Sequence, residues 1–151
     1  MKLVDLLSKD RVVIPLESRE KDGVLKELVA ACAESLGIAE VDGLLRKVRE
    51  REEIKTTGVG KGVALPHAIW DGVDGVKLTL GVAPEGLDFD AFDADPVYLV
   101  FLIVTEGMTT SYPTVLERVA KLFLDEPAWR QILQAGSAAE VLNLLDEIDT
   151  N

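Results

Sequence analysis

The feature that most constrains the fold is an uninterrupted apolar run, PVYLVFLIV, at residues 96–104. The run has the length of a strand and falls well short of the roughly 20 apolar residues that a membrane-crossing helix requires. Because it does not alternate with polar residues, it predicts a strand buried on both faces. A second strand is predicted for VKLTLGVAP at 76–84, which does alternate.

Helical patterns flank these strands. The spacing of apolar residues predicts helices over residues 19–36, 41–53, 112–133 and 137–148. Gly37 is expected to end the first helix and Asp42 to cap the second. Pro127 is expected to interrupt the third, and Ser137 and Glu140 have capping-box spacing at the start of the fourth. Helices at both ends with strands between them predict an α/β fold, with helices packed on a central sheet.

The composition fits one domain over residues 1–151. Hydrophobic residues make up 48% and charged residues 28%, which favours a soluble globular chain over a disordered one. Asp5 and Asp10 interrupt any signal-peptide core, so we expect a cytoplasmic protein without membrane insertion. Cys32 lies on the apolar stripe of the first helix and is interpreted as a core residue. One cysteine and one histidine cannot build a zinc site from this chain alone.

The charge balance excludes one class of partner. With 27 acidic and 16 basic residues the net charge is −11, which argues against a nucleic-acid partner because phosphate backbones require a basic face. Residues 49–67 differ from the rest, since four basic residues there outnumber three acidic ones. The basic residues are Arg49, Arg51, Lys55 and Lys61. This local excess suggests an anionic ligand near the chain's single histidine, His67.

The segment TTGVGKGVALPH, residues 56–67, has glycines at alternate positions. It is not a P-loop, because Gly62 follows Lys61 where serine or threonine is needed, and Lys55 stands where the first glycine belongs. The spacing also does not fit a dinucleotide fingerprint. Two interpretations remain: a simple turn, or a backbone that approaches a ligand closely.

His67 likewise has two interpretations. It is a packed histidine at a strand end, or it is a nucleophile. Neutral imidazole can carry a phosphoryl group as a covalent intermediate, provided that backbone N–H groups, a hydroxyl or an arginine bind the phosphoryl oxygens. Such a role requires no metal, and we expect no cofactor.

One segment of the sequence resembles a known family. The segment REEIKTTGVGKGVALPH, residues 51–67, is similar to the signature of the enzyme IIA domains of the bacterial phosphotransferase system, of the fructose, mannitol and nitrogen-regulatory type. The matching residues are Arg51, Glu52, Thr56, Thr57, Gly58, Gly60, Gly62, Ala64, Pro66 and His67. The similarity continues through residues 86–104 and into the helix after Ser111, and so covers nearly the whole chain.

The resemblance implies a mixed sheet flanked by helices and a phosphohistidine relay. His67 would take a phosphoryl group from the histidine-phosphorylated carrier HPr or a relative of it. It would pass the group to a IIB domain, or its phosphorylation state would regulate partner proteins. Arg51, Thr57 and the backbone of Gly58 and Gly60 are expected to hold the phosphoryl group. A single domain without attached IIB or IIC segments favours the nitrogen-regulatory type.

One position departs from the family pattern. Family members usually carry a second histidine at the start of the late helix, and Tyr112 stands in its place here. Tyrosine can donate a hydrogen bond to a phosphoryl oxygen but cannot carry positive charge. Pro113 biases the preceding residue away from helical geometry, which predicts Tyr112 at a cap position. Tyr112 either supports the site or is a packing aromatic; in the second case the chain is a regulatory binding module with weakened phosphotransfer.

Overall fold

The computed structural model describes residues 2–107, 111–122, 124 and 126–149, and at positions 59, 111 and 112 it describes the backbone alone. With 3-10 helices written η, the elements are η1 (Leu3–Leu6), η2 (Lys9–Arg11), β1 (Val12–Val13), α1 (Lys21–Leu36), α2 (Val41–Ile54), β2 (Gly58–Gly60), β3 (Val63–Ala64), β4 (His67–Ile69), β5 (Val76–Leu87), β6 (Val97–Thr105), α3 (Ser111–Leu122), α4 (Glu126–Arg130), η3 (Gln131–Gln134) and α5 (Ala138–Ile148). Within these described residues, no helix has the length and apolarity needed to cross a membrane.

The strands form one mixed sheet in the order β1-β5-β6-β3-β2. Strand β6 runs antiparallel to β5 on one side and parallel to both β3 and β4 on the other. The two short strands follow one another along β6, because Val63 is opposite Leu99 and His67 is opposite Ile103. The mixed sheet implied by the resemblance is confirmed.

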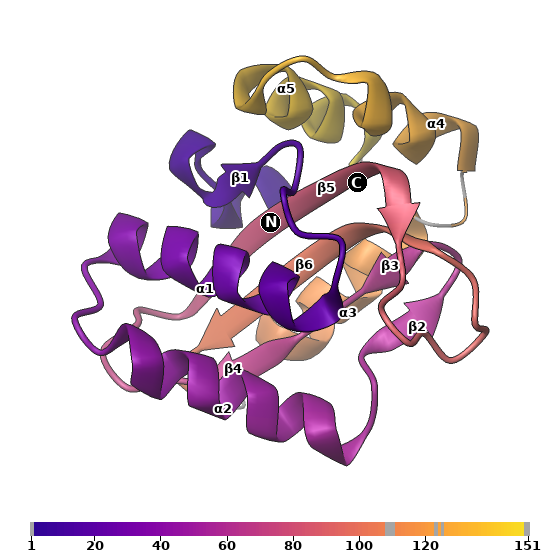
Figure 1. The fold of residues 1–151 in the computed structure, drawn as a ribbon. Coiled ribbons are helices and arrows are strands. Elements are labelled where there is room, and N and C mark those ends of the chain that lie inside the picture. Colours follow the sequence, from indigo (N-terminus) through magenta and orange to yellow (C-terminus); the bar gives the residue numbers. More distant parts are fainter. Residues whose placement is uncertain (1, 108–110, 123, 125, 150–151) are drawn as a thin grey trace.

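Helices cover both faces of the sheet (Figure 1). Helices α1 and α2 pack on one face, and α3, α4 and α5 pack on the other. Strand β6 lies between the two cores and supplies alternate side chains to each. Leu99, Phe101 and Ile103 belong to the core under α3 and α5, whereas Val100, Leu102 and Val104 belong to the core under α1 and α2. The prediction of a strand buried on both faces is confirmed.

Local sequence signals predicted the end of the first helix but not the cap of the second. Gly37 ends α1 in the left-handed conformation, with φ of 71°, as expected for a residue without Cβ. The cap predicted for α2 is wrong: Glu40 is the N-cap residue, and its carbonyl accepts the N–H of Leu44, so Asp42 already lies in the first turn. There its negative charge still favours the helix N-terminus. Cys32 is buried as predicted, and burial raises the pKa of its thiol.

The later helices add one correction. Helix α3 begins at Ser111, so the backbone of Tyr112 lies within the first turn, and the prediction of a cap there is wrong. Pro113 is tolerated because the first N–H groups of a helix have no intrahelical acceptor. The predicted interruption is confirmed, since α3 ends at Leu122 and Pro127 lies in the first turn of α4. Ser137 caps α5 by accepting the N–H of Glu140.

Candidate functional site

His67 lies in a pocket between helix α2 and the strands β4 and β6. The pocket has a volume of about 400 Å³ and is lined by Lys47, Glu50, Arg51, Ile54, His67, Ala68, Ile69 and Thr105. His67 is half-buried and is the first residue of β4, so its position is fixed by pairing with Ile103 of β6. Helix α2 runs alongside β4 (Figure 1). The side chain of Arg51 on this helix reaches the imidazole of His67.

Hydrogen bonds at both ring nitrogens define the state of the imidazole. The Nδ1 atom lies 3.1 Å from the carbonyl oxygen of Leu65. Because a carbonyl only accepts, Nδ1 carries the proton and donates it. In the neutral ring the lone pair is then on Nε2, which accepts a hydrogen bond from Nε of Arg51 at 3.2 Å. The ring nitrogen that carries the lone pair is therefore Nε2, next to a guanidinium group.

The surroundings favour the neutral ring. Burial is the largest influence and lowers the pKa of His67 below its ordinary value of 6.5, and the Arg51 guanidinium lowers the pKa further. The hydrogen bond to Leu65 and the carboxylate of Glu52 act in the opposite direction. A neutral imidazole near pH 7 is the form that can act as a nucleophile.

Arg51 is anchored at the end of its own helix. It lies in the last turn of α2, and its Nη1 donates to the carbonyl oxygen of Lys55 at 2.9 Å. The last carbonyls of a helix have no intrahelical donor, so a side chain that satisfies one is a common form of helix termination. This contact orients the guanidinium so that Nε points at His67.

Thr57 is held by the carboxylate of Glu52. The residue is buried, and its N–H donates to Oε2 of Glu52 at 2.9 Å. Its hydroxyl donates to Oε1 of the same carboxylate. Thr57 does not line the pocket that contains His67. A direct contact between its hydroxyl and a phosphoryl group stays a prediction.

The glycines of the segment pack against residues 91–93. A Cβ atom at Gly58 would lie 2.8 Å from the Cα of Ala91, and one at Gly60 would lie 2.9 Å from Oδ2 of Asp93. Gly60 also has φ of 100°, which side-chain-bearing residues rarely adopt. The N–H of Gly58 donates to Oγ1 of Thr56 at 3.1 Å. Close packing therefore accounts for both glycines, and their binding of phosphoryl oxygens stays a prediction.

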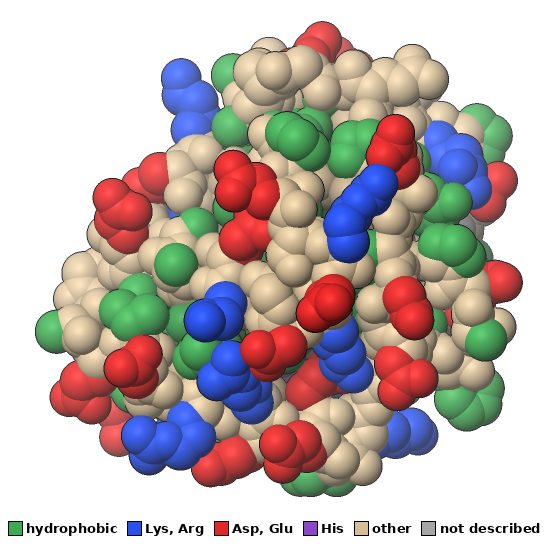
Figure 2. Space-filling model, viewed as in Figure 1, with side chains coloured by type: hydrophobic (Ala, Val, Ile, Leu, Met, Phe, Trp, Pro, Cys, Tyr) green, Lys and Arg blue, Asp and Glu red, His purple; other side chains and the backbone are tan. Residues whose placement is uncertain are grey.

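The basic residues near His67 do not gather into one patch. Arg49 forms a two-point ion pair with Asp22 of α1, at 2.7 and 2.8 Å, and does not line the pocket. Figure 2 shows acidic and basic side chains interspersed over α1 and α2. Lys47, which the sequence analysis did not single out, does line the pocket. Its position four residues before Arg51 on the same helix face was the signal that could have revealed it.

Tyr112 lies in the first turn of α3, but its side chain is outside the described residues. Both interpretations of Tyr112, a residue that supports the histidine site and a packing aromatic, therefore stay predictions.

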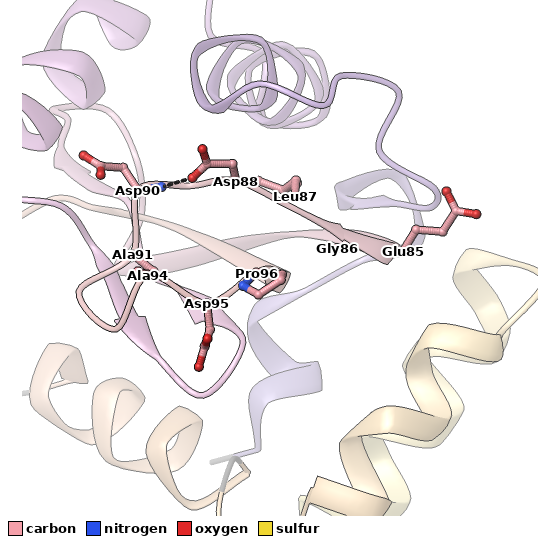
Figure 3. Close-up of a pocket in the computed structure, with 9 residues that line it drawn as sticks. All are labelled: Glu85, Gly86, Leu87, Asp88, Asp90, Ala91, Ala94, Asp95 and Pro96. Atoms are coloured by element: carbon pink, nitrogen blue, oxygen red, sulfur yellow. Dashed lines mark hydrogen bonds between the residues drawn. The ribbon is translucent and has the colours of Figure 1, made fainter.

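A larger cavity of about 510 Å³ lies along residues 85–96 and is lined by four acidic residues (Figure 3). Figure 3 shows the side chain of Asp95 pointing away from those of Asp88 and Asp90, and the side chain of Glu85 at the far end of the segment. Among the described residues, no group of three His, Cys, Asp or Glu side chains is placed to hold a metal ion. The combination of a nucleophile and a neighbouring cation occurs at His67, which we take as the candidate site.

Known proteins resemble this chain over most of its length. Residues 5–148 match the family model of the phosphoenolpyruvate-dependent sugar phosphotransferase system, EIIA 2. The chain belongs to this family. Its relatives carry both sugar-related and nitrogen-related names. The nitrogen regulatory protein of Bradyrhizobium diazoefficiens is 29% identical over 96% of this chain and 95% of its own length. The fructose-specific EIIA component of Haloferax volcanii is 30% identical over 85% of this chain and 84% of its own length.

The fructose-specific EIIABC component of Bacillus subtilis is 29% identical over 99% of the chain, but the chain spans only 24% of that protein. Among solved structures, nitrogen regulatory protein IIA-Ntr from Neisseria meningitidis has a TM-score of 0.83 at 28% identity, covering 95% of this chain and 98% of that one. Enzyme IIA mannitol of Escherichia coli, solved in complex with phosphorylated enzyme IIB mannitol, has a TM-score of 0.77 at 20% identity. The match covers 94% of this chain and 99% of that one. The EIIA fold is thus common to the nitrogen-regulatory and the mannitol proteins.

Proposed function

We propose that the chain is a phosphoryl-relay protein of the phosphotransferase system, phosphorylated on Nε2 of His67 by a histidine-phosphorylated HPr-type carrier. One observation carries the proposal: the Nδ1 proton is donated to Leu65, so the lone pair of the neutral ring is on Nε2, beside Arg51 in an open pocket. Membership of the EIIA family supports it independently. A cytoplasmic location, where such carriers operate, is part of the same proposal.

The transfer step exchanges one P–N bond for another. The Nε2 lone pair of His67 attacks the phosphorus of the donor phosphohistidine, and a new P–N bond forms. The phosphorylated donor ring is an imidazolium, protonated on its other nitrogen. Its bond to phosphorus breaks, and the electron pair returns to the donor ring, which becomes neutral. The His67 ring keeps its Nδ1 proton and becomes positively charged. The Leu65 carbonyl, which accepts that proton in a hydrogen bond, stabilises this charge.

Arg51 has a different partner before and after transfer. Its Nε donates to the neutral Nε2 atom in the free protein, and it would donate to an anionic phosphoryl oxygen once Nε2 is bonded to phosphorus. In the free protein only the donor of this hydrogen bond is charged, whereas after transfer both donor and acceptor would be charged, which adds a Coulomb attraction. Arg51 therefore stabilises the phosphorylated state more than the free state. Lys47, at the edge of the same pocket, adds a second positive charge.

We infer that the output is regulatory, through partner proteins, as in nitrogen regulatory relatives. Two similarities support this choice. The chain and the Bradyrhizobium nitrogen regulatory protein match over nearly their full lengths, and the Neisseria IIA-Ntr structure has the higher TM-score of the two compared above.

A sugar-transport role is the second candidate. The fructose-specific relatives favour it, as does the mannitol enzyme IIA that was solved in complex with its phosphorylated IIB partner. In that case the phosphoryl group would pass from His67 to a IIB domain. Adding purified IIB domains to the phosphorylated chain distinguishes the two roles, because only a transport component loses its phosphoryl group to one of them.

The proposal is tested by incubating the chain with phosphorylated HPr-type carriers, followed by intact-mass measurement under alkaline conditions that preserve phosphohistidine. We expect a gain of one phosphoryl group in the wild type and none in His67→Gln. The absence of any gain in the wild type, or an equal gain in the variant, overturns the proposal. The same assay on Tyr112→Phe decides between a supporting hydroxyl, which would slow transfer, and a packing aromatic, which would leave the rate unchanged.

A further inference from the structure

The carboxylate of Glu52 is buried one residue after Arg51, and its hydrogen bonds lead to both nitrogens of the His67 ring. We propose that Glu52, with Lys21 as its counter-ion, is a positioning residue that fixes the tautomer and orientation of His67. The expected effect of Glu52 on phosphotransfer rests on the proposed function. The effect on the imidazole itself is measurable without any phosphotransfer.

Glu52 is held by three donors. Its side chain is only 4% exposed, and its two oxygens accept the N–H and the hydroxyl of Thr57 and the ammonium of Lys21. The Lys21 Nζ atom lies 2.6 Å from Oε2. A buried carboxylate is stable only when its oxygens are satisfied in this way. The result is a closed turn from Glu52 at the end of α2 to Thr57 at the start of the glycine segment.

The first connection from this turn leads to Nδ1. The carbonyl oxygen of Thr57 accepts the N–H of Leu65 at 3.0 Å. The carbonyl oxygen of Leu65 in turn accepts the Nδ1 proton of His67 at 3.1 Å. Fixing Thr57 on Glu52 therefore fixes the residue that selects the Nδ1–H tautomer.

The second connection leads to Nε2. Lys55 lies inside the turn that Glu52 and Thr57 close, and its carbonyl oxygen accepts Nη1 of Arg51 at 2.9 Å. The same guanidinium donates through Nε to Nε2 of His67 at 3.2 Å. A displaced turn would move the Lys55 carbonyl, and Arg51 would lose the contact that aims it at the ring. Glu52 thus acts on both ring nitrogens although it touches neither.

Lys21 supplies the compensating charge from another element. It is the first residue of α1, and its ammonium also lies 4.9 Å from the ring centre of Phe89 and 3.5 Å from Oγ1 of Thr56. Removing Lys21 would leave a buried carboxylate without its counter-ion, which strongly destabilises such a site. The position of the turn therefore depends on α1 as well as on α2.

The test uses the single histidine of the chain as its own probe. Nitrogen-15 NMR of His67 at a pH where the ring is neutral reports the fraction of each tautomer directly. The variants are Glu52→Gln, Lys21→Met and Thr57→Val, and the matched control is Asp22→Asn. The control breaks the ion pair with Arg49, which joins the same two helices one residue away from Lys21 but lies outside the pocket that His67 lines. Unfolding in urea checks that each variant folds.

We expect the wild type and Asp22→Asn to show one protonated nitrogen, Nδ1, and one unprotonated nitrogen, Nε2. In Glu52→Gln the two nitrogen signals should move toward each other as the second tautomer becomes populated, with smaller shifts in the same direction in Lys21→Met and Thr57→Val. The value of kcat/KM for phosphotransfer should fall about 10-fold or more in Glu52→Gln, mostly in kcat, because a small misplacement of the nucleophile has effects of this size.

Wild-type tautomer signals in folded Glu52→Gln would overturn the inference. If Glu52→Gln does not fold, wild-type signals in both Lys21→Met and Thr57→Val have the same meaning. Failure of the wild-type chain to accept a phosphoryl group would overturn the proposed function, while the tautomer measurement would still decide the role of Glu52.

Discussion

Replacing Arg51 by methionine tests most directly how the site works. The substitution removes the hydrogen bond from Nε to the imidazole at 3.2 Å and the bond from Nη1 to the Lys55 carbonyl at 2.9 Å. A hydrogen bond to a charged group contributes about 1.5–3 kcal/mol, and the long contact to the neutral ring contributes about 0.5–1.5 kcal/mol. Transfer is slowed only by the loss of the extra stabilisation that Arg51 gives the transition state, whose phosphoryl oxygens are already anionic, relative to the free state. That difference is about 1–2 kcal/mol, or roughly 5- to 30-fold in kcat/KM.

The assay is the initial rate of phosphoryl transfer from a phosphorylated HPr-type carrier, measured over a range of carrier concentrations. Arg49→Met is the matched control, since Arg49 lies on the same helix but pairs with Asp22 outside the pocket. Arg51→Lys should be intermediate, because an ammonium keeps the charge but lacks the planar fork that reaches two acceptors.

The same substitution has a second expected effect. The guanidinium is one of the groups that lower the pKa of His67, although burial is the larger one. The pKa of the single histidine, followed by NMR titration, should therefore rise in Arg51→Met and stay unchanged in Arg49→Met. The reasoning would be refuted if Arg51→Met transferred the phosphoryl group at a rate within about 2-fold of the wild type. Such a slowing would be smaller than the loss of its hydrogen bonds predicts.

Two further predictions concern stability. Burial lowers the pKa of His67 in the folded chain relative to 6.5, so the unfolded chain binds the proton more readily. The contribution of this residue to the free energy of unfolding is therefore complete above pH 6.5 and is lost as the pH falls through the folded pKa. Urea unfolding should show a larger loss between about pH 7.5 and about pH 5.5 in the wild type than in His67→Gln, and equal losses would contradict the burial of the ring. Gly62→Ala should destabilise the fold more than Gly72→Ala. Both glycines have positive φ, which costs alanine about 1–2 kcal/mol, but only a Cβ at Gly62 would meet Trp129 and Tyr98, at 3.1 and 3.2 Å. Similar losses in the two variants would show that this packing is looser than described.

The sequence determined the elements whose signals are local. The apolar run at 96–104 could only be a strand covered on both sides, and β6 does supply side chains to both cores. Gly37 ended its helix where predicted because the left-handed conformation is a property of one residue. The family signature singled out His67 as the candidate nucleophile and Arg51 as its helper. These two residues were found because their types and spacing are visible in the chain itself.

Only the tertiary structure decided how these residues are arranged. Arg51 and His67 are 16 positions apart, and they meet because α2 packs beside a strand that pairs with β6. The pairing of the Thr57 hydroxyl and N–H with the buried carboxylate of Glu52 is also a result of packing. The connection from Lys21 through Glu52 to both ring nitrogens joins three separate segments, and no local pattern contains it. Hydrogen-bond partners are chosen by which groups are buried together, and that is settled only when the helices pack on the sheet.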